Sequence, residues 1–171
     1  MSTSHDTTEV APLSPARDLS KLFSPKSIAI VGASRRPGSV GQAVMSNLVH
    51  SDFTGVLYPL NPKAHSVNGI PCVHYIEDLP ETPDLAIMCV PPKVVIESMK
   101  HAAEFGTKDF IVISAGFKEI GGEGAELEQE LRKVIEEYQL NAVGPNCLGL
   151  INTDPEISMN ATFARGSVAS G

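Results

Sequence analysis

The fold of this chain can be approached from the sequence Ser27-Ile-Ala-Ile-Val-Gly-Ala-Ser-Arg-Arg-Pro-Gly-Ser-Val-Gly41 near its amino terminus. Residues 27–31 form a short apolar run, which is typical of a strand buried in a parallel sheet. Apolar residues at helical spacing follow, from Val40 to Leu48, and predict a helix over 39–51. A strand, a glycine-containing loop and a helix in this order indicate the first unit of an α/β fold.

The loop between this strand and this helix has the features of a phosphate-binding loop. Gly32 lets the chain turn off the strand, whereas Gly38 and Gly41 let the backbone approach a ligand. The amide groups at the start of the following helix would point at an anion. The loop is not a GxGxxG motif, because Ser34 replaces the second glycine, and no lysine follows Gly38 as in a P-loop. Its position and the arginines at 35–36 favour phosphate binding over a plain turn.

The rest of the chain alternates between predicted strands and helices. Further strands are expected over 55–60, 84–90, 109–114 and 141–143, with a short extra strand over 70–73. One helix should begin at Pro91-Pro92 and end before Gly106, and apolar residues from Leu127 to Tyr138 mark a longer one. This alternation predicts an α/β fold, a Rossmann-like doubly wound parallel sheet in a single domain.

The sequence divides into three segments. We expect residues 1–18 to be a disordered tail, because the first sixteen are rich in Ser, Thr and Pro and lack apolar periodicity. Residues 19–152 should form the domain, beginning with a short docking helix that Pro25 ends. Residues 153–171 contain no convincing element and are expected to be an extension leading to a following domain that this sequence lacks.

The composition narrows the classes of protein and partner. A length of 171 residues with 42% hydrophobic and 19% charged side chains is typical of one folded domain. The net charge of −7 argues against a nucleic-acid partner, which usually requires a basic stripe. The longest apolar stretch, 85–90, is too short to span a bilayer, and the amino terminus does not resemble a secretory signal. We therefore expect a cytoplasmic protein with no membrane partner.

The cysteines and histidines predict no metal site. Cys72, Cys89 and Cys147 are odd in number and widely spaced, so neither a disulfide framework nor a CxxC motif is indicated. The five histidines include no pair at ligand spacing. No bound metal is expected.

The end of the second strand separates the candidate cofactors. Ligands of doubly wound sheets bind at the carboxyl ends of the strands, and NAD-binding domains carry an acid after the second strand for the ribose hydroxyls. The sequence here is Tyr58-Pro-Leu-Asn-Pro-Lys63, which has no acid. Lys63 would instead meet a phosphate as a point charge. This difference weakens plain NAD and leaves NADP and coenzyme A (CoA) as alternatives.

Three further loops form the expected rims of the cleft. Val90-Pro-Pro92 ends the third core strand, Ser114-Ala-Gly-Phe117 follows the fourth, and Gly144-Pro-Asn-Cys-Leu-Gly149 follows the fifth. The prolines either form a stiff wall against a ligand or start the next helix. Asn146 is placed to hold loops together or to face a substrate. For Cys147 a structural role is favoured over a nucleophilic one, because no histidine is tied to it by sequence.

Together these motifs resemble a known family. The segment Ser24-Pro-Lys-Ser-Ile-Ala-Ile-Val-Gly-Ala-Ser34 and the four later motifs quoted above occur in this order. The chain resembles the N-terminal CoA-binding domain of NDP-forming acyl-CoA synthetases, of the acetate–CoA ligase (ADP-forming) type. The same domain opens the succinyl-CoA synthetase α subunit and some protein acetyltransferases of the Pat type. The resemblance covers roughly residues 19–164.

The resemblance implies a CoA site in the predicted cleft. In the family the glycine loop holds CoA phosphates, a lysine follows the second strand, and the Val-Pro-Pro and Ser-Ala-Gly segments line the site. Carried onto this sequence, the implied CoA-binding residues are Gly38, Ser39, Val40, Gly41, Lys63, Val90, Pro91, Pro92, Ile113, Ser114 and Gly116. Asn146 and Cys147 lie in the loop that the family directs toward the thiol and the acyl phosphate. No catalytic residue is implied within this chain.

The resemblance also implies a reaction, in which acid, CoA and ATP give acyl-CoA, ADP and phosphate. Phosphate passes through a histidine of a following domain and then to an ATP-grasp domain, so these domains are the implied partners. The 171 residues are therefore expected to bind CoA without catalysing the reaction alone. Two alternatives stay open: a CoA- or acyl-CoA-sensing domain of a Pat-type acetyltransferase, and an NADP-binding oxidoreductase domain.

Overall fold

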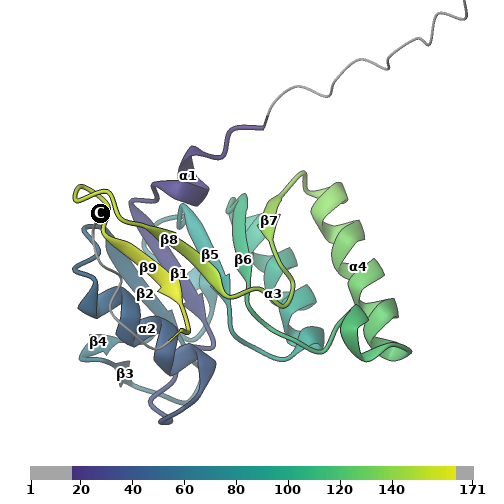
Figure 1. Cartoon of the computed structure of the whole chain (residues 1–171), viewed down its shortest axis with the longest axis horizontal. Coiled ribbons are helices and arrows are strands. Elements are labelled where there is room, and N and C mark those ends of the chain that lie inside the picture. Colours follow the sequence, from purple (N-terminus) through teal and green to yellow (C-terminus); the bar gives the residue numbers. More distant parts are fainter. Residues whose placement is uncertain (1–16, 165–171) are drawn as a thin grey trace, which may run out of the picture.

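A parallel sheet of five strands runs through the middle of the computed structural model, which describes residues 17–164 (Figure 1). The strands lie side by side in the order β2 (Val56–Leu60), β1 (Ser27–Val31), β5 (Leu85–Met88), β6 (Asp109–Val112) and β7 (Asn141–Val143). Numbered among themselves along the chain, the five strands lie in the order 2-1-3-4-5, one of the two common orders of doubly wound sheets. The predicted fold class is confirmed.

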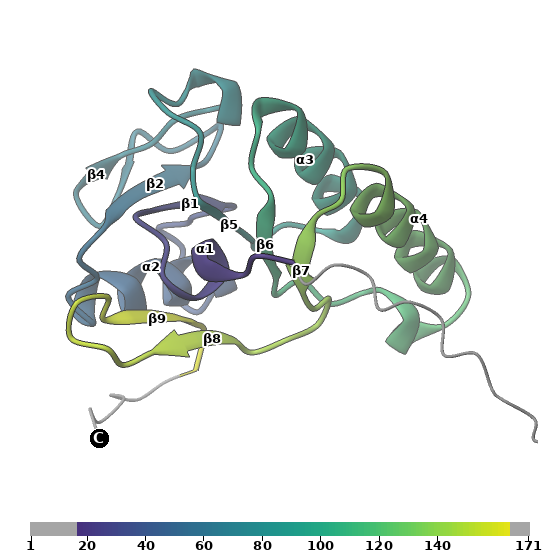
Figure 2. The same ribbon diagram turned by 90° about the horizontal axis from the view of Figure 1, so that it is seen from above.

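Helices cover both faces of this sheet, as Figure 2 shows. Helix α2 (Val40–His50) connects β1 to β2 on one face, whereas α3 (Pro92–Phe105) and α4 (Glu123–Glu137) lie on the other. The chain therefore leaves β1 and β5 toward opposite faces. The point between these two neighbouring strands is the switch point, where ligands of such folds bind.

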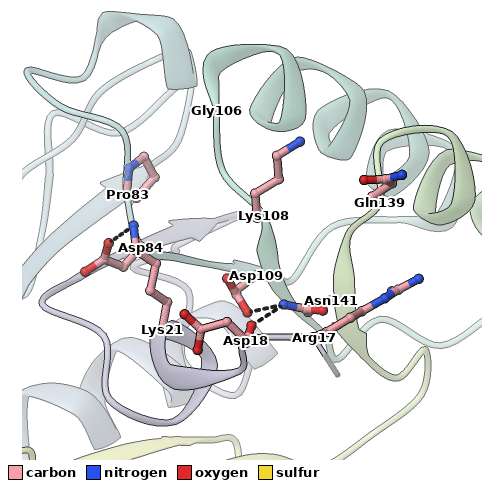
Figure 3. A pocket seen from close by; sticks show the side chains of 10 residues that line it. All are labelled: Arg17, Asp18, Lys21, Pro83, Asp84, Gly106, Lys108, Asp109, Gln139 and Asn141. Carbon is pink, nitrogen blue, oxygen red and sulfur yellow. Dashed lines mark hydrogen bonds and ion pairs between the residues drawn. The ribbon is translucent and has the colours of Figure 1, made fainter. Parts of the chain in front are cut away.

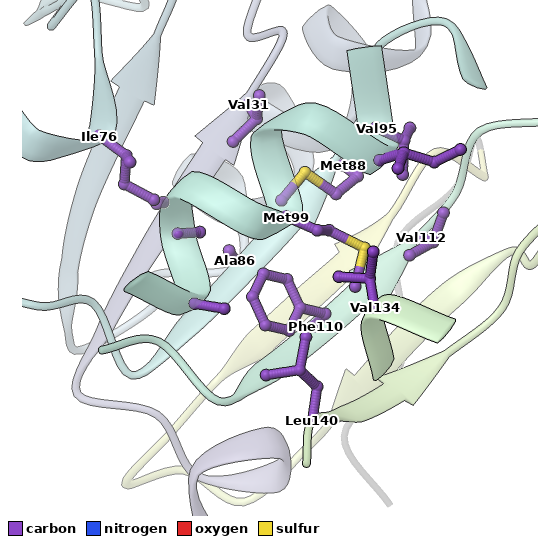
Figure 4. Packing of buried hydrophobic residues seen from close by; sticks show 14 of the residues in the cluster. Val31, Ile76, Ala86, Met88, Val95, Met99, Phe110, Val112, Val134 and Leu140 are labelled. Atoms are coloured by element: carbon purple, nitrogen blue, oxygen red, sulfur yellow. The ribbon is translucent and has the colours of Figure 1, made fainter. Parts of the chain in front are cut away.

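The apolar run of β1 is explained by burial on both of its faces. Ile28 and Ile30 pack with the residues of α2, and Ala29 packs with those of α3 and α4 on the opposite face. Around the ring of Phe110 in β6, Figure 4 shows Met99 and other side chains that close the α3 and α4 side of the core. A strand that is covered on both faces therefore has a nearly continuous apolar sequence.

The ends of α3 follow the sequence signals closely. Pro92 occupies the first position of the helix, where its missing amide proton and its fixed φ are favourable. Gly106 ends the helix with φ 113°, a left-handed conformation that glycine adopts without strain. Both predictions for this helix are confirmed.

Several short elements surround the sheet. They are α1 (Ser20–Phe23), β3 (Ser66–Val67), β4 (Ile70–Pro71) and the 3₁₀ helices η1 (Ile76–Asp78) and η2 (Lys118–Ile120). The predicted docking helix is present, and it buries Leu22. The predicted extra strand is shorter than 70–73 and pairs antiparallel with β3. Val73, which follows β4 and lies within the predicted range, forms an isolated parallel bridge with Leu60 of the main sheet.

The prediction that the chain after Asn152 contains no regular element is wrong. Strands β8 (Gly149–Asn152) and β9 (Met159–Thr162) form an antiparallel hairpin, and all four residues of β9 are buried. Met159 and Ala161 join the core beneath α2. The sequence Met-Asn-Ala-Thr carries one long apolar side chain, so its burial arises from tertiary packing and leaves no local pattern.

The amino-terminal segment reaches the domain earlier than expected. Arg17 and Asp18, assigned to the predicted tail, both touch the domain: Arg17 Nη1 donates to Leu140 O at 2.7 Å, and Asn141 Nδ2 donates to Asp18 O at 2.9 Å. The prediction of disorder for residues 1–16 lies outside the described residues, as does the part of the predicted extension over 165–171.

Candidate functional site

The five loops that the sequence singled out follow the carboxyl ends of β1, β2, β5, β6 and β7, and therefore share one edge of the sheet. At the switch point the chain is tightly packed. A Cβ atom on Gly32 would lie 2.7 Å from the carbonyl oxygen of Cys89 and from Cγ1 of Val90. Gly32 also has φ 90°, so glycine is required there both by conformation and by space.

The two later glycines of the first loop differ in their surroundings. Gly38 has φ 77° and is exposed, with open space where a Cβ would lie. Gly41 is buried in α2, and a Cβ there would collide with the carbonyl oxygen of Gly32. Gly41 therefore lets the helix pack closely on the turn after β1, whereas Gly38 leaves backbone accessible to a ligand. The predicted CoA contacts of both glycines stay predictions.

The start of α2 is open to an anion. Ser39 precedes the helix in an extended conformation, and its Oγ donates to Arg36 O at 2.8 Å instead of capping the helix. Within residues 17–164 no side chain caps this terminus. The first amide groups of a helix have no partner inside it and carry partial positive charge. Such a terminus, next to an exposed glycine, can bind a phosphate.

A groove of about 370 Å³ begins at this terminus and follows one flank of α2. We call it the α2 groove; it is lined by Gly38, Ser39, Val40, Gln42, Ala43, Ser46, Asn47, Phe163 and Ala164. Three of these residues, Gly38, Ser39 and Val40, belong to the predicted CoA site. The far wall, Phe163 and Ala164, comes from the chain beyond β9, which sequence reasoning did not connect to the site.

Asn61 organises the turn after β2, and the sequence analysis missed it. Its Nδ2 donates to Ala33 O at 2.7 Å, which ties this turn to the loop after β1. Its Oδ1 accepts hydrogen bonds from Lys63 N at 2.8 Å and Ala64 N at 3.1 Å. An asparagine that accepts from the backbone two residues later is a common turn signal, and it was present in Asn-Pro-Lys. Lys63 itself is exposed at the edge of this turn.

The loops after β5 and β6 pack against each other. A Cβ on Gly116 would lie 3.0 Å from Cγ of Pro92, so these two predicted site residues are neighbours. Ser114 Oγ donates to Met88 O at 3.2 Å, which joins the end of β6 to that of β5. Ile113 is only 4% exposed, and its side chain belongs to the core beneath α2. Only its backbone is left for a ligand.

A carboxylate also reaches this region. Glu119 Oε1 accepts a hydrogen bond from Gly116 N at 2.5 Å, and bonds from the backbone amides of this turn lower the pKa of Glu119. The backbone amide of Gly116 is thereby occupied in this structure. A ligand that used that amide would have to displace Glu119.

The loop after β7 joins the same edge through its backbone. Asn146 N donates to Ser114 O at 3.0 Å, and Asn146 has φ 54° with an exposed side chain. The backbone of Asn146 thus holds two loops together, and its side chain faces outward. Cys147 Sγ lies 3.4 Å from Val112 O, its hydrogen-bond acceptor.

The thiols of Cys89 and Cys147 have raised pKa values. Burial raises the pKa of the Cys147 thiol. Burial, with a smaller contribution from Cys147, raises the pKa of Cys89 to about 12. The thiolate is the reactive form of cysteine, and raised pKa values favour the protonated form of both side chains at neutral pH. This agrees with the favoured structural role of Cys147.

A second cavity, of about 600 Å³, lies at the opposite edge, where β5, β6 and β7 begin (Figure 3). Lys21 Nζ forms an ion pair with Asp84 at 2.7 Å, and Asp109 accepts a hydrogen bond from Asn141 Nδ2 at 3.0 Å. These groups pair with one another, and ligands of this fold bind at the other edge. We therefore place the candidate site at the carboxyl edge.

Two other findings limit the chemistry of the described residues. Over residues 17–164, no three histidine, cysteine or acidic side chains are grouped in a way that could hold a metal ion. Within the same range, none of the helices has the length and apolar character needed to cross a membrane.

A doubly wound parallel sheet with an open glycine loop after its first strand defines the class of Rossmann-like nucleotide-binding domains. Within that class, residues 26–153 match the family model described as CoA binding domain. The chain belongs to this family.

Its relatives are larger proteins. Acetate–CoA ligase (ADP-forming) I of Archaeoglobus fulgidus is 48% identical over 147 residues, which cover 86% of this chain and 21% of the relative. The 4-hydroxybutyrate–CoA ligase (ADP-forming) of Nitrosopumilus maritimus is 38% identical over 152 residues, with coverage of 89% and 22%. The chain spans about a fifth of the length of these relatives.

A solved structure agrees with the fold and the family. The dinucleotide forming acetyl-coenzyme A synthetase 1 of Ca. Korarchaeum cryptofilum, in complex with phosphate and ADP, aligns with a TM-score of 0.82 and 38% identity. The alignment covers 90% of this chain and 32% of that one. This chain therefore matches the part of ADP-forming acyl-CoA synthetases that corresponds to the CoA-binding domain.

Proposed function

We propose that this chain presents the thiol of CoA in a larger enzyme that interconverts acid, CoA and ATP with acyl-CoA, ADP and phosphate. The observation that carries the proposal is the uncapped start of α2 beside the exposed Gly38, at the switch point of the sheet. The names of the two relatives support this type of reaction, because both relatives are ADP-forming CoA ligases.

In this proposal the predicted residues divide the contacts with CoA among three groups of loops. The backbone from Gly38 to Gly41 and the start of α2 bind phosphate groups of CoA, and Lys63 adds a positive charge from the turn after β2. Val90, Pro91 and Pro92 line the cleft, and Ser114 and Gly116 line it beside them. The loop that contains Asn146 and Cys147 lies toward the reacting end of the ligand.

The chemical step would use a thiol that this domain holds in place. The sulfur of CoA attacks the carbonyl carbon of an acyl phosphate, the carbon–sulfur bond forms, and the bond to the phosphate oxygen breaks. The thiol proton is released and inorganic phosphate leaves. Holding the thiol in line with its electrophile is the contribution expected of a binding domain. Half-buried Cys89 and Cys147, with raised pKa values, would not compete as nucleophiles.

The remaining steps would take place in other domains. The family resemblance supports a histidine that carries phosphate and an ATP-grasp domain as partners in the whole enzyme. The three cysteines are free thiols, which suits a reducing compartment, and we propose the cytoplasm as its location.

Calorimetric titration of the 171-residue chain tests this function. CoA should bind, dephospho-CoA should bind more weakly because it lacks one phosphate, and NADPH should give no saturable heat. A mixture of acetate, CoA and ATP should yield no acetyl-CoA with this chain alone. Folded protein that binds NADPH but not CoA would replace the proposal with an NADP-binding domain. Synthesis of acetyl-CoA by the chain alone would refute the assignment of catalysis to other domains.

A further inference from the structure

The two walls of the α2 groove come from distant parts of the sequence. One wall is the flank of α2, where Ser39, Gln42 and Ser46 recur at helical spacing. The other wall is the segment 162–164, which leaves the hairpin at the end of β9. The ladder between β8 and β9 ends with the pair of Gly149 and Thr162, so strand pairing does not fix Phe163 and Ala164.

Asn47 fixes this segment instead. Its Nδ2 donates to Thr162 O at 2.7 Å and to Ala164 O at 3.0 Å. Both protons of one side-chain amide are thus used on two carbonyl groups of the same segment. Asn47 is half-buried in the third turn of α2, so its side chain has little freedom to turn elsewhere.

The same two hydrogen bonds change the electrostatics of the groove. Carbonyl oxygens carry partial negative charge and would oppose an anion bound at the start of α2. With their lone pairs directed at Asn47, the two carbonyls are partly neutralised, and the segment can lie beside an anionic ligand. Phe163 also lines the groove, and its apolar ring beside a bound anion would displace water and strengthen the attraction of the anion to the helix terminus.

We infer that Asn47 is a positioning residue that holds residues 162–164 as the second wall of the CoA phosphate site. This inference rests on the proposed function, because it takes the anion at the start of α2 to be a phosphate of CoA. The inference implies that CoA binding is coupled to the conformation of residues 162–164. CoA slows the opening of residues 162–164, and holding these residues in place strengthens CoA binding by the same factor.

Amide hydrogen exchange, followed by NMR with and without saturating CoA, measures this coupling. In the unaltered chain, CoA should slow exchange of the amides of residues 162–164 by about tenfold, since ligand contact suppresses local opening. Asn47→Leu keeps the branched shape of the side chain, with a somewhat larger volume, but has no donor. This variant should reduce the protection by CoA to less than about twofold. It should also weaken CoA binding several-fold, which corresponds to the net free energy of a typical hydrogen bond.

Asn152→Leu is the matched control. Asn152 also donates its amide, to Phe23 O at 2.8 Å, but from the other strand of the hairpin and away from the groove. It should leave the protection by CoA unchanged. Asn47→Ser, whose hydroxyl is too short to reach both carbonyls, provides a second test if the leucine variant does not fold.

The outcomes separate this inference from the proposed function. If CoA does not bind the unaltered chain, the proposed function fails and the inference fails with it. If CoA binds but leaves exchange of residues 162–164 unchanged, only the inference is overturned. Full protection in both Asn47 variants, or equal loss in Asn152→Leu, would also overturn it, because protection would then depend on general stability of the hairpin.

Discussion

The side-chain amide of Asn61 donates a hydrogen bond to the carbonyl oxygen of Ala33 at 2.7 Å, joining the turn after β2 to the loop after β1. Lys63 belongs to the first of these segments, and the exposed Gly38 belongs to the second. Because Oδ1 of Asn61 also accepts from Lys63 N, one side chain sets the position of the lysine relative to the glycine loop. This relationship makes Asn61 the first target for mutation.

Asn61→Asp should weaken CoA binding by at least about tenfold. The aspartate keeps an acceptor for Lys63 N but loses the donor to Ala33 O, and it adds a negative charge near the proposed phosphates. Calorimetry with CoA measures the change, and Asn152→Asp provides an equal change of charge elsewhere. Equal CoA affinity in the Asn61 variant and the unaltered chain would show that this turn lies outside the site.

Lys63→Ala tests the proposed phosphate contact directly. If the ammonium group meets a phosphate, the free energy of CoA binding should become less favourable by about 1–3 kcal/mol. The loss should shrink as salt is added, because ions screen an exposed charge. Lys108→Ala removes the same charge at the other edge of the sheet, where Lys108 donates to Tyr138 O, and should leave CoA affinity unchanged. A similar loss in both variants would point to net charge instead of contact.

The sequence predicted the main strands and the shared edge of the sheet at which the candidate loops meet, for a physical reason. Strands enclosed on both faces, such as β1 and β5, are apolar at almost every position, so their burial can be predicted from the local sequence. Once parallel strands alternate with helices, the ligand-binding edge follows from topology alone. The positions of the five loops could therefore be predicted without coordinates.

What the sequence did not reveal depends on contacts between distant residues. The burial of β9 comes from packing against α2, and the link from Asn61 to Ala33 joins two loops 28 residues apart. Ile113 stands next to Ser114 in the motif, yet strand alternation turns its side chain into the core beneath α2. Such features become visible only when the elements are assembled.

The cysteines should react slowly in the folded protein. Because burial raises the pKa of Cys89 to about 12, and also raises that of Cys147, both remain protonated near pH 8. Iodoacetamide at pH 8, with labelled peptides counted by mass spectrometry, should modify Cys89 most slowly and Cys147 more slowly than it does in urea. Cys147→Ser should retain CoA affinity. Rapid labelling of Cys147 in the folded chain would contradict the structural role.

Two acids at the amino edge should affect stability in opposite directions with pH. Burial raises the pKa of Asp109 above its ordinary value of 3.8. Ionised Asp109 therefore lowers the free energy of unfolding. This destabilisation is absent well below pH 3.8 and complete above the pKa in the folded state. Burial also opposes ionisation of Asp84, but Lys21 and the amide of Lys26 outweigh it and lower the pKa. Asp84 therefore stabilises the fold above pH 3.8, and this contribution is lost as pH falls through its lowered pKa.

Urea unfolding of two variants at several pH values measures these contributions. Asp109→Asn keeps an acceptor for Asn141 and should raise the free energy of unfolding at pH 7, with the gain disappearing toward acid pH. Asp84→Asn should lower it at pH 7, with the loss disappearing toward acid pH. The same sign of change at pH 7 in both variants would contradict the opposite pKa shifts.

Removal of β9 tests whether the hairpin belongs to the domain. A chain ending at Asn152 would lose Met159 and Ala161 from the core and uncover the face of α2 that they pack against. Burying a methionine side chain alone contributes about 1.5–3 kcal/mol, so the free energy of unfolding should fall by at least about 3 kcal/mol once the hairpin hydrogen bonds are included. A chain ending at Ala164 retains the whole hairpin and should unfold at the same urea concentration as the full sequence. If both shortened chains were equally stable, residues 153–164 would be an extension with no structural part in the CoA-binding domain.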